Sequence, residues 1–137
     1  MERQDLAATF ALIARQLADA ERPLLAAHGL SMWAYIVLSH LKRASVGTQL
    51  ELAHAIGYDK TRLIARLDEL EADGLVTREP DPSDRRARRV NLTAAGRARH
   101  TAAQSDIRAM EDELLATLPP AECKLLLNVL PRLIAEH

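Results

Sequence analysis

The sequence has little of what disulfide-rich, β-rich or membrane-spanning proteins contain. Its 137 residues include a single cysteine, Cys123, so an intramolecular disulfide framework is excluded and a reducing compartment is expected. Aromatic residues make up 3% of the chain, and valine and isoleucine together number 11, whereas alanine and leucine number 24 and 23. Because alanine and leucine favour helix over sheet, this balance excludes an all-β fold and predicts a mostly helical protein.

Long apolar runs are also missing. No stretch approaches the roughly 20 apolar residues that a transmembrane helix needs. The first ten residues carry two acidic side chains and lack a positive region followed by an apolar stretch, so they are not typical of a secretory signal. We therefore expect a cytoplasmic protein with no membrane partner.

The net charge of −1 conceals an uneven distribution along the chain. Residues 1–40 carry three basic and four acidic side chains, residues 41–100 carry twelve and nine, and residues 101–137 carry three and six. Taken alone, an excess of three positive charges is ordinary scatter. A basic middle between acidic ends nevertheless fits an anionic partner for the middle of the chain.

Two helices are predicted before residue 44. Apolar residues recur with a period of 3.5 between Leu6 and Leu24, which predicts a helix that packs lengthwise on another helix. Pro23 should kink or end it, because proline lacks the N–H and its ring crowds the preceding turn. After Gly29, Ser31 is a suitable N-cap for a second helix. The expected buried face of that helix consists of Trp33, Ile36, Val37, His40 and Leu41.

A helix-turn-helix is predicted in the middle of the chain. After a short connection at residues 45–47, Thr48 and Glu51 have the spacing of a capping box, which opens a third helix that ends before Gly57. Asp59 can cap a fourth helix. Two helices joined by a turn of three or four residues that contains glycine are typical of this motif.

The fourth helix is expected from about residue 60 to residue 73, where Gly74 supplies the left-handed residue that ends it. Its inner face carries Leu63, Leu67 and Leu70. Polar residues outside this face are Lys60, Thr61, Arg62 and Arg66. The two arginines are four positions apart and repel each other, so this surface favours an anion unless Asp59, Asp68 and Glu69 neutralise it locally. Recognition helices contact base edges mainly through their N-terminal residues, where three of the four polar residues lie.

The residues that follow predict a wing. Two short strands, residues 75–79 and 87–92, flank a polar loop at residues 80–86. Four arginines lie within five positions: Arg85, Arg86, Arg88 and Arg89. Because arginine binds phosphate with paired hydrogen bonds and fits a narrow minor groove, an arginine-rich hairpin beside a recognition helix suits DNA. A solvated charged hairpin is the alternative for an isolated run of this kind.

Two more helices complete the chain. Thr93 can cap a long helix whose apolar residues return to near-heptad spacing. Pro119 and Pro120 force a bend, and a last helix begins at about Ala121, with a kink expected at Pro131. The predicted fold is a winged helix-turn-helix, mostly α with a small β-hairpin, flanked by N- and C-terminal helices.

Residues 48–96 resemble the winged-helix domain of the MarR (multiple antibiotic resistance regulator) family. The resemblance is carried by LEADGLVTR at residues 70–78, by the DPxDRR pattern at residues 81–86 and by VNLTAAG at residues 90–96. The flanking helices match the layout of the family, so the resemblance extends over nearly the whole chain. It implies a single MarR-like domain, with residues 31–96 as the DNA-binding lobe and residues 1–30 and 97–137 as dimerisation helices.

The resemblance also implies a function. The chain is similar to homodimeric proteins that place two recognition helices in successive major grooves of a pseudo-palindromic operator. The simplest function that this similarity implies is repression of transcription. The expected DNA-binding residues are Thr48, Lys60, Thr61, Arg62, Arg66, Asp84, Arg85, Arg86 and Arg88. Arg86 maps onto the wing arginine of the family that enters the minor groove, with Asp84 as its orienting partner. Arg62 and Ile64 stand where the family often has serine or threonine, so the operator sequence stays open.

A ligand site is a second implication of the resemblance. Many MarR-like repressors release DNA when a small aromatic or phenolic anion enters a crevice between the dimer helices and the winged domain. An amphipathic pocket with one cation suits such a ligand. The residues expected to face the crevice are Arg15, His28, Met32, Trp33 and His40. Ordinary core packing is the alternative for each of them.

No pattern in the sequence predicts catalysis, a metal or a cofactor. The five histidines lack HxxxH spacing, and Glu51 with His54 is equally explained as a surface pair. GxSxG, P-loop and glycine-rich dinucleotide motifs are missing from the sequence. Cys123 has no thiolate-activating neighbour in sequence, so it is expected to act as a small hydrophobic residue rather than as a redox sensor.

The sequence therefore predicts a homodimeric, DNA-binding transcriptional regulator that is not an enzyme. One alternative is a winged-helix module whose basic surface binds an acidic protein. Another is a redox or ligand sensor without strong sequence-specific DNA binding. The arginine-rich wing and the polar face of the fourth helix favour DNA over both.

Overall fold

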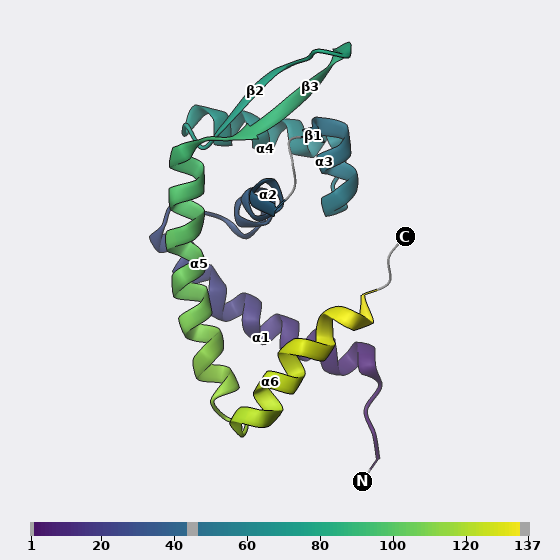
Figure 1. Cartoon of the computed structure of the whole chain (residues 1–137), viewed down its shortest axis with the longest axis vertical. Coiled ribbons are helices and arrows are strands. Elements are labelled where there is room, and N and C mark those ends of the chain that lie inside the picture. The colour runs from purple at the N-terminus through teal and green to yellow at the C-terminus, as the bar shows by residue number, and fades with distance from the viewer. Residues whose placement is uncertain (1, 44–46, 135–137) are drawn as a thin grey trace.

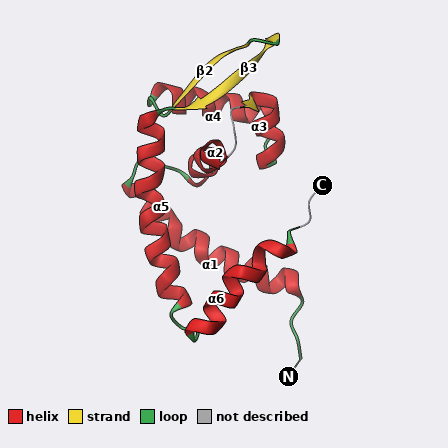
Figure 2. Ribbon diagram, viewed as in Figure 1, coloured by secondary structure: helices red, strands yellow, loops and turns green. Residues whose placement is uncertain are grey.

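The computed structural model describes residues 2–43 and 47–134, and these residues are mostly helical with one small sheet, as predicted (Figures 1 and 2). The helices are α1 (Leu6–Ala27), α2 (Met32–Arg43), α3 (Gln49–Ile56), α4 (Lys60–Ala72), α5 (Ala94–Leu115), α6 (Pro120–Val129) and the short 3-10 helix η1 (Leu130–Leu133). The strands are β1 (Gly47–Thr48), β2 (Val76–Asp81) and β3 (Asp84–Leu92). They form an antiparallel sheet in the order β1-β3-β2.

The elements gather at two ends of the molecule (Figure 1). The helix-turn-helix α3–α4, the sheet and α2 form one end, which we call the winged-helix lobe, and α1 crosses α6 at the other end. Helix α5 connects the two ends and packs against both α1 and α2. His28, which follows α1, lies 2.6 Å from Asp106 of α5 through its Nε2 atom and adds a polar link between these helices.

The helix starts agree with the sequence analysis. The Thr48 hydroxyl accepts a hydrogen bond from the Glu51 N–H at 3.2 Å, and the Asp59 carboxylate accepts one from the Arg62 N–H at 3.2 Å. Ser31 caps α2 in the same way, with its hydroxyl accepting from the Ala34 N–H. These side chains accept hydrogen bonds from backbone N–H groups that the first turn of a helix leaves without a partner. The starts of these helices could therefore be predicted from the sequence.

The core lies between α2, α4, α5 and the sheet. The predicted inner face of α4 is confirmed, because Leu63, Leu67 and Leu70 are buried. The predicted face of α2 is only partly right: Val37 is buried as expected, together with Ala34 and Leu38, whereas Ile36 is exposed and Trp33, His40 and Leu41 are half-buried. Two adjacent apolar stripes run along this helix, and contacts with α3, α5 and β3 select the one that is buried.

Pro23 does not end the first helix, which contradicts one of the two outcomes expected for it. Helix α1 passes through Pro23 and continues to Ala27. Pro23 and Asp19, whose carbonyl loses its N–H partner, both lie at the surface. Water can therefore satisfy the freed carbonyl, which makes a proline tolerable at this position.

The hairpin is longer than predicted. Its turn is confined to residues 82 and 83, so the expected loop is mostly strand and Arg85 and Arg86 lie on β3. The Asp81 carboxylate accepts hydrogen bonds from the N–H and the hydroxyl of Ser83, at 3.2 and 3.1 Å, and so closes the turn. Pro80 does not interrupt β2, because β2 is at the edge of the sheet and its missing N–H is not needed for pairing.

Two further expectations need correction. The two-residue strand β1 pairs with Val90 and Arg89 of β3 and was not expected, and the rest of the predicted connection at residues 45–47 lies outside the described residues. The last α-helix ends at Val129, and Pro131 belongs to η1 rather than to a kinked continuation. In a 3-10 turn the first residues need no N–H donor, so proline fits there.

Among residues 2–43 and 47–134, no single helix is long and apolar enough to cross a membrane. Helices α1 and α2 meet the length and composition requirement only as a pair, and that pair is bent by 84°.

Candidate nucleic-acid interface

A groove lies between the helix-turn-helix and the wing. Its volume is about 510 Å³, and it is lined by Thr48, Gln49, Leu50, Glu51, Lys60, Asp81, Asp84, Arg86, Ala87 and Arg88. Five of the nine residues predicted to bind DNA are in this set, although they come from three separate elements. The structure thus brings together the start of α3, the start of α4 and the tip of the wing. Because the acidic side chains of Glu51 and the wing also line it, the groove is mixed in charge rather than uniformly basic.

The wing tip presents Arg86 to solvent. Its side chain is 94% exposed, and its backbone N–H donates to the Asp84 carboxylate at 3.0 Å. The Arg86 Nε atom lies 3.7 Å from the same carboxylate oxygen. Asp84 therefore contacts both the backbone and the Nε atom of Arg86, while the Arg86 side chain remains almost fully exposed.

The first turn of α4 is open to solvent. Lys60, Thr61 and Arg62 are exposed, and Arg85 and Arg88 of the wing are exposed as well. Within the described residues, this turn is engaged through its backbone, by the cap that Asp59 provides. The side chains are therefore available to an external partner.

Arg66 lies on a different side of α4 from the groove. Its guanidinium sits 4.9 Å from the centre of the Trp33 ring and 3.6 Å from the Glu69 carboxylate. This arrangement combines a cation–π contact with the local neutralisation that the sequence analysis gave as its alternative. A second hollow of about 300 Å³ adjoins this pair and is lined by Gly29, Ser31, Trp33, Ala34, Arg66, Glu69, Leu70 and Asp73.

The five residues expected around a ligand crevice are not brought together by this hollow. Trp33 lines it, whereas Arg15, His28, Met32 and His40 do not. Arg15 is exposed on α1, and His28 is paired with Asp106. Met32 and His40 are half-buried on α2, as ordinary packing of that helix predicts.

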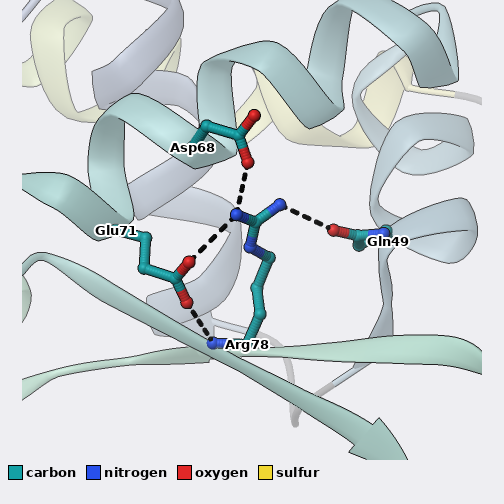
Figure 3. A network of polar contacts seen from close by, with 4 residues as sticks. All are labelled: Gln49, Asp68, Glu71 and Arg78. Atoms are coloured by element: carbon teal, nitrogen blue, oxygen red, sulfur yellow. Dashed lines mark hydrogen bonds and ion pairs between the residues drawn. The ribbon is translucent and has the colours of Figure 1, made fainter.

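The sequence analysis missed Arg78, which carries the densest polar network beside the groove (Figure 3). Its side chain is 9% exposed, and one terminal nitrogen donates to both Asp68 and Glu71 of α4, the latter at 3.0 Å. The other terminal nitrogen donates to the Gln49 side chain at 3.2 Å. The hydrogen bond from this guanidinium lowers the pKa of Glu71. The available signal was an arginine in a strand directly after an acidic helix end, within LEADGLVTR.

A metal site is not visible in the part of the chain that the structure describes. Residues 2–43 and 47–134 contain no group of three or more histidine, cysteine, aspartate or glutamate side chains that could hold an ion. Cys123 is a half-buried free thiol on α6.

A helix-turn-helix followed by an arginine-rich β-hairpin, with a groove between them, defines the winged-helix class. Residues 28–87 match the model of the MarR family. The matched residues cover α2, the helix-turn-helix and most of the wing, and the match confirms the resemblance found in the sequence motifs.

Solved structures extend the likeness to the whole fold. Apo MarR from E. coli is similar with a TM-score of 0.86 and 24% identity, over 98% of this chain and 100% of that one. A MarR family transcriptional regulator from Rhodococcus sp. RHA1 has a TM-score of 0.77 and 25% identity, over 93% and 94% of the two chains. A cysteine-to-serine mutant of E. coli MarR, in a complex with operator DNA, has a TM-score of 0.78 and 24% identity, over 95% and 94%.

Proposed function

We propose that this protein is a sequence-specific transcriptional regulator that binds duplex DNA as a homodimer. The observation that carries the proposal is the groove in which Lys60 of α4 lies together with Arg86 and Arg88 of the wing. One duplex can contact both walls of such a groove, with the recognition helix in the major groove and the wing beside it. The operator complex of the E. coli MarR mutant, which shares this fold, supports the same mode of binding here.

Each predicted residue has a proposed role. Lys60, Thr61 and Arg62 contact base edges or phosphates in the major groove, and Arg86 enters the minor groove with Asp84 as its support. Thr48, Arg85 and Arg88 contact phosphates on either side. Arg66 is the weakest member of the set, because Trp33 and Glu69 already engage it. It is proposed only as a distant phosphate contact.

The homodimer is proposed from the apolar surface at the other end of the molecule. Large apolar side chains are exposed along α1, α6 and η1: Leu6, Phe10, Leu12, Ile13, Leu125, Leu127 and Leu133. They lie on neighbouring elements at one end of the molecule (Figure 1), and a grouped apolar surface of this kind is typical of a protein–protein contact. We assign residues 1–30 and 97–137 to dimerisation and residues 31–96 to DNA binding. A two-fold dimer would place two copies of α4 on a pseudo-palindromic operator.

Repression and release by a small aromatic anion complete the proposal. The hollow is lined by Trp33 and Arg66, so an aromatic anion that binds there would compete with Trp33 and Glu69 for the Arg66 guanidinium. Titration with phenolic acids, followed by thermal shift and by calorimetry, tests this part. A flat response in both measurements would remove the ligand from the proposal and leave DNA binding unaffected.

The central experiment measures DNA binding by fluorescence anisotropy. The probes are the duplex upstream of the gene that encodes this protein and a scrambled duplex of the same composition, each over a series of salt concentrations. We expect tighter binding to the upstream duplex and a steep decrease with salt, because phosphate contacts release counterions. Equal and weak binding to both duplexes would favour a module that binds an acidic protein.

Arg86→Ala tests the wing in the same assay. The variant is expected to keep its fold, because the Arg86 side chain is 94% exposed. Operator affinity should fall about 10-fold, since a base-contacting arginine is worth about 1–3 kcal/mol. The matched control is Arg22→Ala, which removes an exposed arginine of α1 that pairs with Asp19 of the same helix at 2.6 Å. Equal affinities for wild type and Arg86→Ala would refute the assigned role of the wing.

A further inference from the structure

Arg78 joins the three elements that build the proposed interface (Figure 3). It lies on β2, which continues into the wing, and its guanidinium contacts Asp68 and Glu71 of α4 and Gln49 of α3. Gln49, Asp68 and Glu71 are 29, 10 and 7 residues away from it in sequence. A planar guanidinium presents several donors in a fixed fork, so it sets the directions of its partners as well as their distances.

Glu71 holds β2 by two atoms at once. One of its carboxylate oxygens accepts from the guanidinium at 3.0 Å, and the other accepts from the Arg78 backbone N–H at 3.1 Å. Because β2 is at the edge of the sheet, this N–H has no strand partner there. The end of α4 is thereby tied to both the side chain and the main chain of the strand.

The arrangement fixes the wing as well as the helix. Arg78 pairs with Val90 of β3, and two residues further along the hairpin Pro80 pairs with Arg88 of the groove. A rotation of β2 against α4 would therefore carry the wing tip with it. The buried position of the guanidinium resists such a rotation, because a 9% exposed arginine that loses its carboxylates would be left as an unpaired buried charge.

The contact with Asp68 reaches the outer face of the recognition helix. Thr61, Ala65 and Asp68 are spaced i, i+4 and i+7 on α4, and all three are exposed. The link from β2 thus ends on the same face as Thr61, which is proposed to contact DNA.

We infer that Arg78 is a positioning residue for DNA recognition: by binding Asp68, Glu71 and Gln49 together, it sets the orientation of the wing relative to α4. The inference rests on the proposed function. It adds a residue that does not contact DNA but determines whether Arg86 and the start of α4 can engage one duplex together.

The test compares Arg78→Met with wild type in the full chain. We expect the affinity for the specific duplex to fall at least about 10-fold, while the affinity for the scrambled duplex changes much less, because non-specific binding depends on charge rather than on orientation. Lys42→Met is the control, since it removes a cation of α2 that donates to Thr101 at 2.9 Å and does not line the groove. Its specific binding should equal that of wild type.

Two additional variants separate positioning from stability. Arg78→Lys keeps the positive charge but lacks the planar guanidinium. Relative to Arg78→Met, it should therefore restore the melting temperature more than the affinity for the specific duplex. In a double-mutant cycle, the loss of operator affinity caused by Arg86→Ala should be smaller in the Arg78→Met background. The reason is that Arg86 of a misoriented wing already contacts the operator poorly. If Arg78→Met does not fold, Gln49→Ala takes its place, because it removes one hydrogen bond and leaves both carboxylates paired.

Two results would overturn the inference. One is an Arg78→Met protein with a lower melting temperature but an unchanged ratio of specific to non-specific affinity. The other is a strictly additive cycle with Arg86→Ala. Failure of the proposed function is distinct from both, because it would appear as a wild-type protein that does not distinguish the two duplexes.

Discussion

His100 is one of two polar side chains that the described core buries, and it is only 1% exposed. Its ring stacks on Tyr35 of α2, with centroids 4.7 Å apart, and its Nε2 atom lies 2.7 Å from the Ser39 hydroxyl. The Nδ1 atom has no hydrogen-bond partner among the described residues. Burial lowers the pKa of His100, and the positive charges of Lys42, Arg108, Arg43 and Arg97 lower it further.

The direction of this shift predicts a pH dependence of stability. A histidine whose pKa is lower in the folded state stabilises the fold above its unfolded pKa of about 6.5, and this stability is lost as the pH falls below that value. His100→Phe keeps the stack on Tyr35 but cannot titrate. Between about pH 7.5 and about pH 5.5, the melting temperature of wild type should therefore decrease more than that of His100→Phe. Parallel decreases, measured by circular dichroism, would show that His100 does not cause the pH dependence.

At the same scale, the individual arginines of the interface differ in what surrounds them. Arg86 is almost fully exposed, Arg66 is engaged by Trp33, and Arg78 is enclosed by three partners. Sequence reasoning treated the exposed arginines as candidates for an anionic partner, and their exposure agrees with that prediction. It missed Arg78, because the contacts that enclose this arginine come from two other elements, with Gln49 29 residues away.

Among the elements, α5 begins where the chain leaves the sheet, and its start depends on Gly96. A Cβ atom at this position would lie 2.1 Å from the Leu75 carbonyl oxygen and 2.8 Å from a Leu92 methyl carbon. Thr93 caps the same turn, with its hydroxyl accepting from the Gly96 N–H at 2.9 Å. The glycine of the VNLTAAG motif is therefore required by close packing of the helix against the backbone before β2.

Gly96→Ala should destabilise the protein. In an exposed helix, replacing glycine by alanine stabilises by about 1 kcal/mol, so the sign of the effect is diagnostic. Here the added methyl group meets backbone, and we expect a decrease of about 3 kcal/mol in the free energy of unfolding. Denaturant titration measures it, with Ala95→Gly at the neighbouring exposed position as the control. A more stable Gly96→Ala protein would contradict the packing described for this turn.

The secondary structure elements also show where prediction succeeded and where it did not. Caps, turn glycines and the leucine face of α4 were predicted, because each depends on residues within one or two turns. The hairpin was predicted too short because a polar, proline-containing tip predicts a loop, although Pro80 pairs with Arg88 and Asp81 with Asp84. Strand β1 was missed because its partners on β3, Val90 and Arg89, are remote in sequence. A three-strand sheet cannot be derived from the apolar pattern of a polar, arginine-rich segment.

At the scale of the whole molecule, α1 and α6 are incompletely packed. Only Leu25 of α1 is buried and no described residue of α6 is, whereas Phe10 and Leu127 are 44% and 55% exposed. A hollow of about 390 Å³ between α1, α5 and α6 has a mostly apolar lining. Such helices need a further apolar partner, which the proposed homodimer supplies.

Leu127→Glu tests this proposal. A carboxylate on the apolar face of α6 should weaken self-association, because burial of an unpaired charge is costly. Light scattering coupled to size exclusion should report a dimer for wild type and a smaller species for the variant. Ala55→Glu, at an exposed position of α3, is the control and should keep the wild-type mass. Identical masses for wild type and Leu127→Glu would exclude this surface as the dimer contact.

The sequence by itself determined the helical class, the positions of the caps and turns, and the family motifs of the winged-helix lobe. These features depend on neighbours along the chain, where side-chain hydrogen bonds and helical periodicity act. Tertiary structure decided which stripe of α2 is buried, that the wing and the start of α4 share one groove, and that Arg78 links β2 to α3 and α4. Those outcomes depend on contacts between residues far apart in sequence, and such contacts form only when the complete chain has packed.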